Sequence, residues 1–198
     1  MALAAAILAS GCAGGGAGAL PLSKSPPPAA RRATSAAARG TYAWLTAAPA
    51  PAGWRSTRVS SGAVLAYPGT WRAIHGDRGT ASAALLDSRG RYLGYLNLTP
   101  RQGDETQATW SSFRVRHNAG EGERNEALEA SATGLRFRTG AGACVSDSYT
   151  TSTRTRYREI ACLVNGTRTS SVIVAAAPVL QWSAELPVLE RSISAMRT

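Results

Sequence analysis

The sequence predicts an α+β fold in which an antiparallel β-sheet is combined with two helices. Several short apolar or alternating runs lie between turn residues, as strands do, and two other segments space their apolar residues as one face of a helix. The strands come in groups and do not alternate one by one with helices, so a parallel βαβ sheet is not expected. The predicted order is β-β-β-α-β-β-β-β-α over residues 54–198.

The first three strands are expected at residues 62–68, 80–87 and 91–100. Each of these runs is rich in apolar residues, and glycine-containing segments separate them. Such segments favour turns between neighbouring strands. The sequence of the first third of the domain therefore predicts a small antiparallel meander of three strands.

The pattern then changes to the period of a helix. Trp110, Phe113 and His117 recur at helical spacing, which predicts that they share one face of the helix. On such a face, a histidine is expected to be packed or to lie at the rim rather than to act as a base. Glycines at 120 and 122 end this helix, and the alternating run at 126–132 predicts the fourth strand.

A symmetrical hairpin is predicted between residues 142–151 and 155–164. The strand-like runs VSDSYT and RYREIA flank the polar turn TSTRT, whose centre is Thr153. Opposed residues then have numbers that sum to 306, so Cys144 lies opposite Cys162. Opposed Cα atoms in an antiparallel pair are about 4.5–5.5 Å apart, a distance that a disulfide can bridge.

Two further pairs follow from the same register. Asp147 faces Glu159, and Tyr149 faces Tyr157. Opposed carboxylates repel each other, and such a pair can share a proton or hold a cation. These four residues therefore form a candidate polar binding patch. The alternative is that Arg156, Arg158 or another arginine neutralises the carboxylates, or that the register slips, and these interpretations stay open.

The last two elements are a further hairpin strand and a closing helix. Asn165-Gly166 lies between strand-like runs and predicts a type I′ turn, so the next strand is expected over residues 167–177. Apolar residues then recur at helical spacing from Leu186 to Met196. Ser183 is the expected N-cap of this helix, which places Pro187 in its first turn.

The domain resembles the PsbP-like family. The run LAYPGTW contains Tyr67-Pro68-x-x-Trp71, and it follows the first strand. One helix after three strands, a long antiparallel meander and a closing helix behind AAAPVLQW match that family's order of elements. The resemblance covers residues 54–198 and implies an antiparallel sheet with helices packed on both faces. It implies binding or assembly proteins rather than one chemistry, and it assigns no cofactor residue.

Residues 1–11 are expected to be a signal peptide. The run ALAAAILA at 2–9 has the length of a signal-peptide core and is far too short to span a bilayer. The following Ala9-Ser10-Gly11-Cys12 resembles a bacterial lipobox, in which a peptidase cuts before a cysteine that carries a diacylglyceryl group. Cys12 is therefore the expected lipid attachment site. The alternative is plain secretion, in which Cys12 has no role.

Residues 12–53 are expected to be a lipidated flexible tether, because they consist mainly of small residues that cannot form a core. Before Trp54 there are four cations and no acids, and the rest of the chain contains all 12 acids. Lys24 is the one lysine among 22 lysine and arginine residues. Codon bias and selected function both explain this arginine excess, and both explanations stay open.

Export determines what is expected of the two remaining cysteines. Thiols oxidise outside the cytoplasm, so Cys144 and Cys162 are expected to form a structural disulfide. A redox-active or metal-binding pair is the alternative. The sequence opposes it, because there is no C-x-x-C spacing and both His75 and His117 are isolated. No metal site and no cofactor are expected.

These observations favour a lipid-anchored, non-catalytic domain on the extracytoplasmic face of the cell membrane, with the membrane as its partner through Cys12. An envelope protein or an anionic wall or lipid component is the expected ligand, because the domain is positively charged. Nucleic acid is not expected outside the cell. A carrier of small molecules or ions, with a pocket between sheet and helix, is the first alternative. A secreted enzyme is the second, although no G-x-S-x-G or H-E-x-x-H motif is present.

Overall fold

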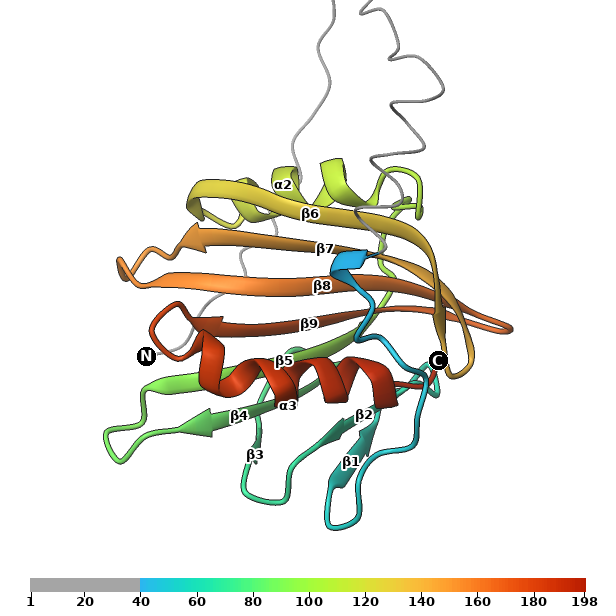
Figure 1. Cartoon of the computed structure of the whole chain (residues 1–198), viewed down its shortest axis with the longest axis horizontal. Helices are drawn as coiled ribbons and strands as arrows, with labels where there is room; N and C mark the ends of the chain where they lie inside the picture. The colour runs from blue at the N-terminus through green and yellow to red at the C-terminus, as the bar shows by residue number, and fades with distance from the viewer. Residues whose placement is uncertain (1–39) are drawn as a thin grey trace, which may run out of the picture.

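The structure is a computed structural model that describes residues 40–198, so the predicted signal peptide, Cys12 and most of the predicted tether lie outside the described residues. The strands are β1 (Arg55–Arg58), β2 (Val64–Tyr67), β3 (Arg72–Ile74), β4 (Ala81–Leu86), β5 (Tyr92–Pro100), β6 (Arg124–Phe137), β7 (Gly140–Thr150), β8 (Arg156–Gly166) and β9 (Ser170–Pro178). Two helices, α2 (Trp110–Gly120) and α3 (Trp182–Ala195), accompany them (Figure 1).

Seven strands form one antiparallel sheet in the order β3-β4-β5-β9-β8-β7-β6, and β1 and β2 form a separate pair. The predicted α+β class and the predicted order of the longer elements are confirmed. Strands β1 and β3 were not predicted. They have four and three residues, and such short segments show no recognisable alternation.

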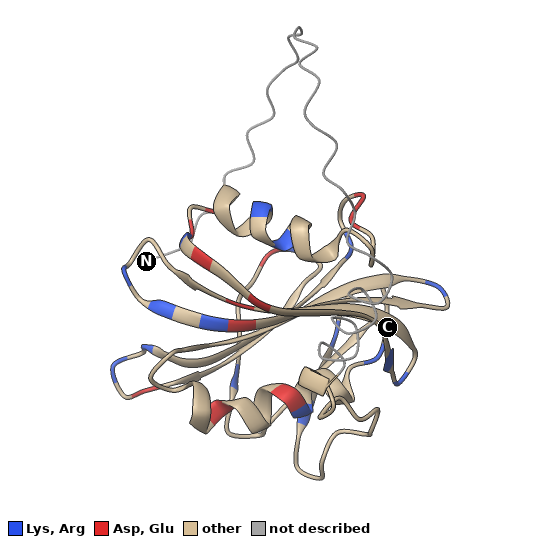
Figure 2. Cartoon of the chain, turned by 45° about the horizontal axis from the view of Figure 1, so that its top comes forward, with Lys and Arg blue, Asp and Glu red and all other residues tan. Residues whose placement is uncertain are grey.

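The two helices lie on opposite faces of the sheet, as the family resemblance implies (Figure 2). Helix α3 contacts β9, β5 and β2, whereas α2 contacts β6 and β7. We refer to the two sides of the sheet as the α3 face and the α2 face. None of the helices in residues 40–198 is both long enough and apolar enough to span a membrane.

The predicted register of the β7–β8 hairpin is the observed one. Cys144 pairs with Cys162, Asp147 with Glu159, and Tyr149 with Tyr157. The two cysteine sulfurs are bonded at 2.06 Å and their Cα atoms are 4.1 Å apart. Because side chains alternate along a strand, the disulfide lies on the α3 face and the two carboxylates lie on the α2 face.

The α3 face carries the larger apolar core. The disulfide is fully buried there together with large side chains from the sheet and from α3, which include Leu96, Leu98, Ile173, Leu189 and Ile193. Each buried leucine or isoleucine contributes about 1.5–3 kcal/mol through the hydrophobic effect. The α3 face therefore provides most of the stability that holds the sheet in shape.

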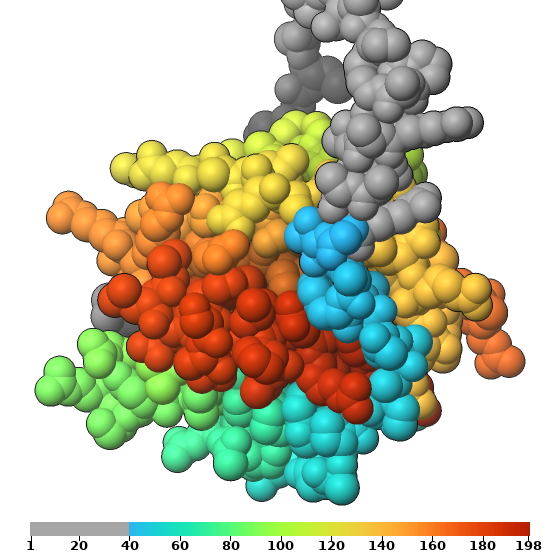
Figure 3. Space-filling model, in the orientation of Figure 1, coloured from blue at the N-terminus to red at the C-terminus, as the bar shows by residue number. Residues whose placement is uncertain are grey.

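The folded part of the chain begins earlier than the predicted boundary between residues 53 and 54. Tyr42 is buried in the α3-face core, and its hydroxyl donates a hydrogen bond of 3.3 Å to the Ala130 carbonyl. The Ala48 amide donates a hydrogen bond to the Ser194 carbonyl. Figure 3 shows this segment, in blue, lying against the sheet and α3. Small residues surround Tyr42 in the sequence, so the local composition concealed its packing.

Two predicted boundaries near the C-terminus are also corrected. Strands β8 and β9 pair from Asn165 and Ser170, so four residues form the turn and Asn165-Gly166 is not its centre. Helix α3 begins at Trp182 after an N-cap at Gln181, so Ser183 is not the cap and Pro187 lies inside the helix rather than in its first turn. Trp182 is buried, and packing of this ring favours the earlier start.

We expect the disulfide to stabilise the domain substantially. It closes a sequence separation of 18 residues, and in the chain-entropy model a loop of this length contributes about 3 kcal/mol. Adding a reductant should therefore lower the unfolding free energy by about that amount in urea denaturation.

The double variant Cys144→Ala/Cys162→Ala is the control, because its stability should not respond to the reductant. Thiol titration of the denatured, unreduced protein provides an independent measurement. Two free thiols in the domain would contradict the disulfide.

Candidate functional site

Helix α2 presents three side chains to the sheet that the sequence analysis did not group together. Trp110, Arg114 and Asn118 are its buried residues, spaced four apart. The Trp110 indole Nε1–H donates a hydrogen bond of 2.9 Å to the Ala161 carbonyl. The helix is therefore attached to the sheet by one aromatic side chain and two polar ones.

Trp110, Phe113 and His117 share one face of α2, as predicted, and His117 lies at the rim of that face. Trp110 is buried, but the His117 side chain is 43% exposed. The three rings stack in succession along the flank of the helix, with 5.6 Å between neighbouring centroids. They form an aromatic row at the edge of the interface, while Arg114 occupies its centre.

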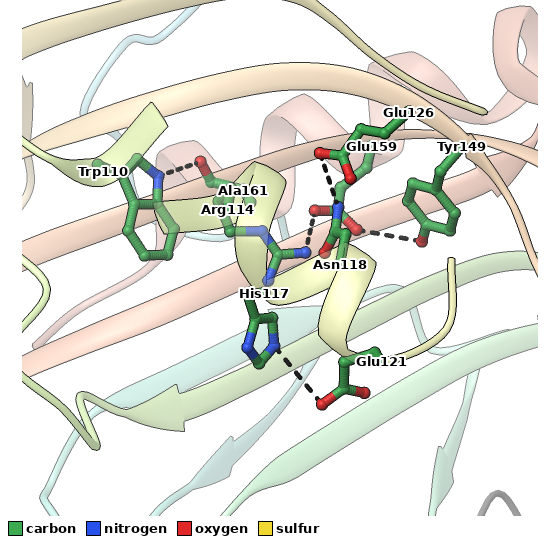
Figure 4. Close-up of polar contacts among 9 residues, drawn as sticks. All are labelled: Trp110, Arg114, His117, Asn118, Glu121, Glu126, Tyr149, Glu159 and Ala161. Carbon is green, nitrogen blue, oxygen red and sulfur yellow. Dashed lines mark hydrogen bonds and ion pairs between the residues drawn. The ribbon is translucent and has the colours of Figure 1, made fainter. Parts of the chain in front are cut away.

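Arg114 forms a buried ion pair with Glu159 across the helix–sheet interface (Figure 4). The Arg114 side chain is 8% exposed and that of Glu159 is 2% exposed. The Tyr149 hydroxyl donates a hydrogen bond of 3.1 Å to the other Glu159 carboxylate oxygen. Glu159 thus accepts hydrogen bonds from both α2 and β7, as a buried charge requires.

The arginines of the hairpin itself do not neutralise these carboxylates. Arg158 lies on the α3 face, where it pairs with Glu129 and stacks over the Trp182 ring at 5.0 Å. Strand alternation places it on the side of the sheet opposite Glu159. The cation held by the carboxylate pair is therefore Arg114, from an element outside the hairpin.

Asp147 is fully buried opposite Glu159, and neither of its carboxyl oxygens has a hydrogen-bond partner among the described residues. Burial and, to a smaller extent, the negative charge of Glu159 raise the pKa of Asp147 to about 8, against the opposing effect of Arg114. Asp147 is therefore protonated at neutral pH. One negative and one positive charge remain in the interface, so the cluster has no net charge.

The two tyrosines of the candidate patch stack with their ring centroids 6.1 Å apart and an angle of 12° between planes. Burial raises the pKa of both phenols, so both are neutral hydroxyl groups. The Tyr149 hydroxyl donates its hydrogen bond to Glu159. The structure therefore brings all four predicted patch residues together, but it places both carboxylates beneath α2 and out of reach of solvent.

The C-terminal end of α2 carries a more accessible acidic group of residues. Asn118 donates a hydrogen bond of 3.3 Å to Glu126, and the His117 ring lies 3.8 Å from a Glu121 oxygen. Burial and the charge of Arg114 lower the pKa of His117, so its ring is neutral at neutral pH. Burial and neighbouring carboxylates raise the pKa of Glu123 to about 7.

His75 lies in the exposed segment between β3 and β4, apart from every other feature of the site. Residues 40–198 contain no group of three or more His, Cys, Asp or Glu side chains that could hold a metal ion. The predicted lipid attachment at Cys12 lies outside the described residues.

Solved structures provide a comparison for the fold. The chain is similar to cyanobacterial PsbP (CyanoP) from Synechocystis sp. PCC 6803, with 12% identity, a TM-score of 0.53, and coverage of 75% of this chain and 94% of that chain. PA94, a Pseudomonas aeruginosa protein of unknown function, has 11% identity and a TM-score of 0.49, covering 73% of this chain and 96% of its own.

LpqN, involved in cell envelope biogenesis of Mycobacterium tuberculosis, has 12% identity and a TM-score of 0.38, covering 75% of this chain and 79% of its own. No family model and no curated protein matches the chain. The similarity to CyanoP supports the PsbP-like fold that the sequence predicts, and at this identity it concerns the fold alone.

We expect Arg114→Met to destabilise the domain by about 3–5 kcal/mol, because Glu159 would remain buried without its counter-ion. The double variant Arg114→Met/Glu159→Gln should be less damaging than the sum of the two single variants. Urea denaturation measures all three. Arg116→Met, exposed on the same helix, is the matched control and should change stability by less than about 0.5 kcal/mol. An equal effect of both arginine substitutions would contradict the buried ion pair.

We also expect stability to fall as pH rises from about 5 to 8. Asp147 has a folded-state pKa of about 8, whereas an unfolded aspartate titrates near 3.9, so the folded state binds the extra proton. The slope of unfolding free energy against pH that this group contributes is at most about 1.4 kcal/mol per pH unit.

Asp147→Asn should reduce this slope, as measured by urea midpoints across the same pH range. Asp77→Asn, in an exposed turn, should keep the wild-type slope. An unchanged slope in Asp147→Asn would show that Asp147 is already ionised.

Proposed function

We propose that the protein is a membrane-anchored extracytoplasmic lipoprotein whose folded domain binds an envelope component and catalyses no reaction. In this proposal residues 1–11 are removed as a signal peptide, Cys12 carries the lipid, and the following tether leads to the domain. The expected ligand is an envelope protein or an anionic wall or lipid component.

The observation that carries this proposal is the Cys144–Cys162 disulfide in the centre of the sheet. Disulfides persist in oxidising compartments and are rare in the cytoplasm. A domain that depends on one is therefore expected outside the cytoplasm. The ILASGC stretch that ends at Cys12 provides a route to that location and a means of retention there.

The arrangement of ionisable groups supports a non-catalytic domain. Arg114, Glu159 and Tyr149 satisfy one another and join α2 to the sheet. A catalytic acid or base must reach a substrate proton directly or through one water molecule. The groups with strongly shifted pKa values that lie beneath α2 have no such access, so a structural role accounts for their shifts.

A carrier that holds a small molecule between sheet and helix is less well supported. The cavity between Trp110 of α2 and Cys144 of β7 has a volume of about 30 Å³. A volume of this size suits about one water molecule, whereas pockets for small ligands usually measure about 300–1,000 Å³. A ligand of that size would require α2 to move away from the sheet.

Substitution of Cys12 tests the anchor. In the producing cell, Cys12→Ala should move the protein from the membrane fraction to the medium, or leave an unprocessed precursor, because the acyl chains that hold it can no longer be attached. Immunoblotting of membrane, soluble and medium fractions measures the change.

Ser10→Ala is the matched control, since it keeps Cys12 and a small residue before the cleavage point. It should leave both processing and location unchanged. Intact-mass analysis of the wild-type protein provides the direct test. A chain that is uncut and carries no lipid would refute the anchored lipoprotein.

A further inference from the structure

A polar cavity of about 380 Å³ lies at the end of the sheet where β5 stops and the β8–β9 hairpin turns. Its polar lining consists of Ser61, Arg101, Thr167, Arg168, Thr169 and Ser170. No acidic residue lines it. We call this cavity the arginine pocket.

The corrected β8–β9 turn builds one wall of the arginine pocket. Asn165 pairs with Ser170, and the Gly166 amide donates a hydrogen bond of 2.9 Å to the Thr169 carbonyl, which closes the turn. The Arg101 amide donates a hydrogen bond of 2.9 Å to the Ser170 carbonyl. The backbone of Arg101, just after β5, is thereby fixed beside the β8–β9 turn that carries Arg168, so both cations line one cavity.

Both positive charges in the arginine pocket lack a partner. Within residues 40–198, neither the Arg101 nor the Arg168 side chain makes a hydrogen bond or an ion pair. Among the described residues only Arg91, Arg114 and Arg158 pair with carboxylates, so what distinguishes Arg101 and Arg168 is that they line one cavity without an acidic residue. The charge of the pocket is therefore available to an external anion.

A hydroxyl group in the same cavity also lacks a partner. Ser61 lies in the turn between β1 and β2, and its Oγ is buried with no hydrogen-bond partner among the described residues. Buried polar atoms normally have a partner, so an unpartnered hydroxyl in the lining of the arginine pocket needs an explanation. A bound anion would supply the missing acceptor.

The donor set of the arginine pocket suits a phosphate group. Each guanidinium group presents several N–H donors in a planar fork that matches two oxygens of a phosphate. Hydroxyl groups from the hairpin and from Ser61 can donate to the remaining oxygens. The volume accommodates a phosphate together with part of the molecule that carries it.

We propose that the arginine pocket binds the phosphate group of an anionic lipid headgroup. The arginine pocket lies at the β8–β9 turn. Gly140 pairs with Gly166 of that turn, and the Thr198 amide donates a hydrogen bond to the Thr139 hydroxyl, so Arg138 and Arg197 lie at the same end of the sheet. Figure 2 shows basic residues at the hairpin tip and around the C-terminus. Basic residues near an anionic membrane surface strengthen the attraction to it. The choice of a lipid rests on the proposed membrane location, whereas the phosphate chemistry rests on the pocket alone.

The test uses the full chain with Cys12→Ala, so that acyl chains cannot hold it on a membrane. Vesicles of phosphatidylcholine containing phosphatidylglycerol should sediment this protein, and vesicles of phosphatidylcholine alone should not. Inorganic phosphate should compete with the vesicles. Arg101→Gln/Arg168→Gln should weaken vesicle binding roughly tenfold or more, which corresponds to the loss of charge-assisted hydrogen bonds.

Arg89→Gln/Arg154→Gln is the matched control, because it removes the same charge from turns at the opposite end of the sheet. It should change vesicle binding less than twofold.

Equal losses of vesicle binding in both double variants would overturn the pocket in favour of general charge attraction. Phosphate binding that depends on the pocket, without vesicle binding, would overturn the lipid headgroup as the source. No binding of either probe would overturn the site, and the cell-fractionation result for Cys12 would stand independently.

Discussion

The register between β7 and β8 is the constraint on which the rest of the structure depends. It places Cys144 opposite Cys162 on one face of the sheet and Asp147 opposite Glu159 on the other. Because side chains alternate along a strand, a slip of one residue would exchange these faces. If β8 slipped, Cys162 would then lie beneath α2, and Glu159 would enter the apolar α3-face core. The disulfide excludes that slip covalently.

The two helices are held to the sheet by different physical interactions. Helix α3 buries Leu189 and Ile193 in a large apolar cluster, and such packing tolerates small displacements. Helix α2 relies on Trp110 and on the Arg114–Glu159 pair, whose polar contacts are directional. A buried pair of this kind fixes an orientation more than it adds stability, because desolvation offsets much of its attraction. The charge balance beneath α2 therefore determines where this helix sits.

The arginine excess divides into groups with different surroundings. Arg114 pairs with a buried carboxylate, and Arg158 pairs with a partly exposed one. Arg101 and Arg168 face a cavity that contains no acid. Codon bias can raise the number of arginines, but it does not decide which of them remain unpaired in one cavity. The distribution therefore says more about a partner than the net charge of +10 does.

The sequence by itself determined the longer elements and the hairpin pairing, because these depend on local alternation and on a turn whose centre, Thr153, is visible in the chain. It could not identify Arg114 as the partner of Glu159, since 45 residues separate them and only the packing of α2 brings them together. The burial of Tyr42, the start of α3 at Trp182 and the meeting of Arg101 with Arg168 were likewise decided by tertiary structure. Each depends on contacts between distant segments, which no local pattern of residue types encodes.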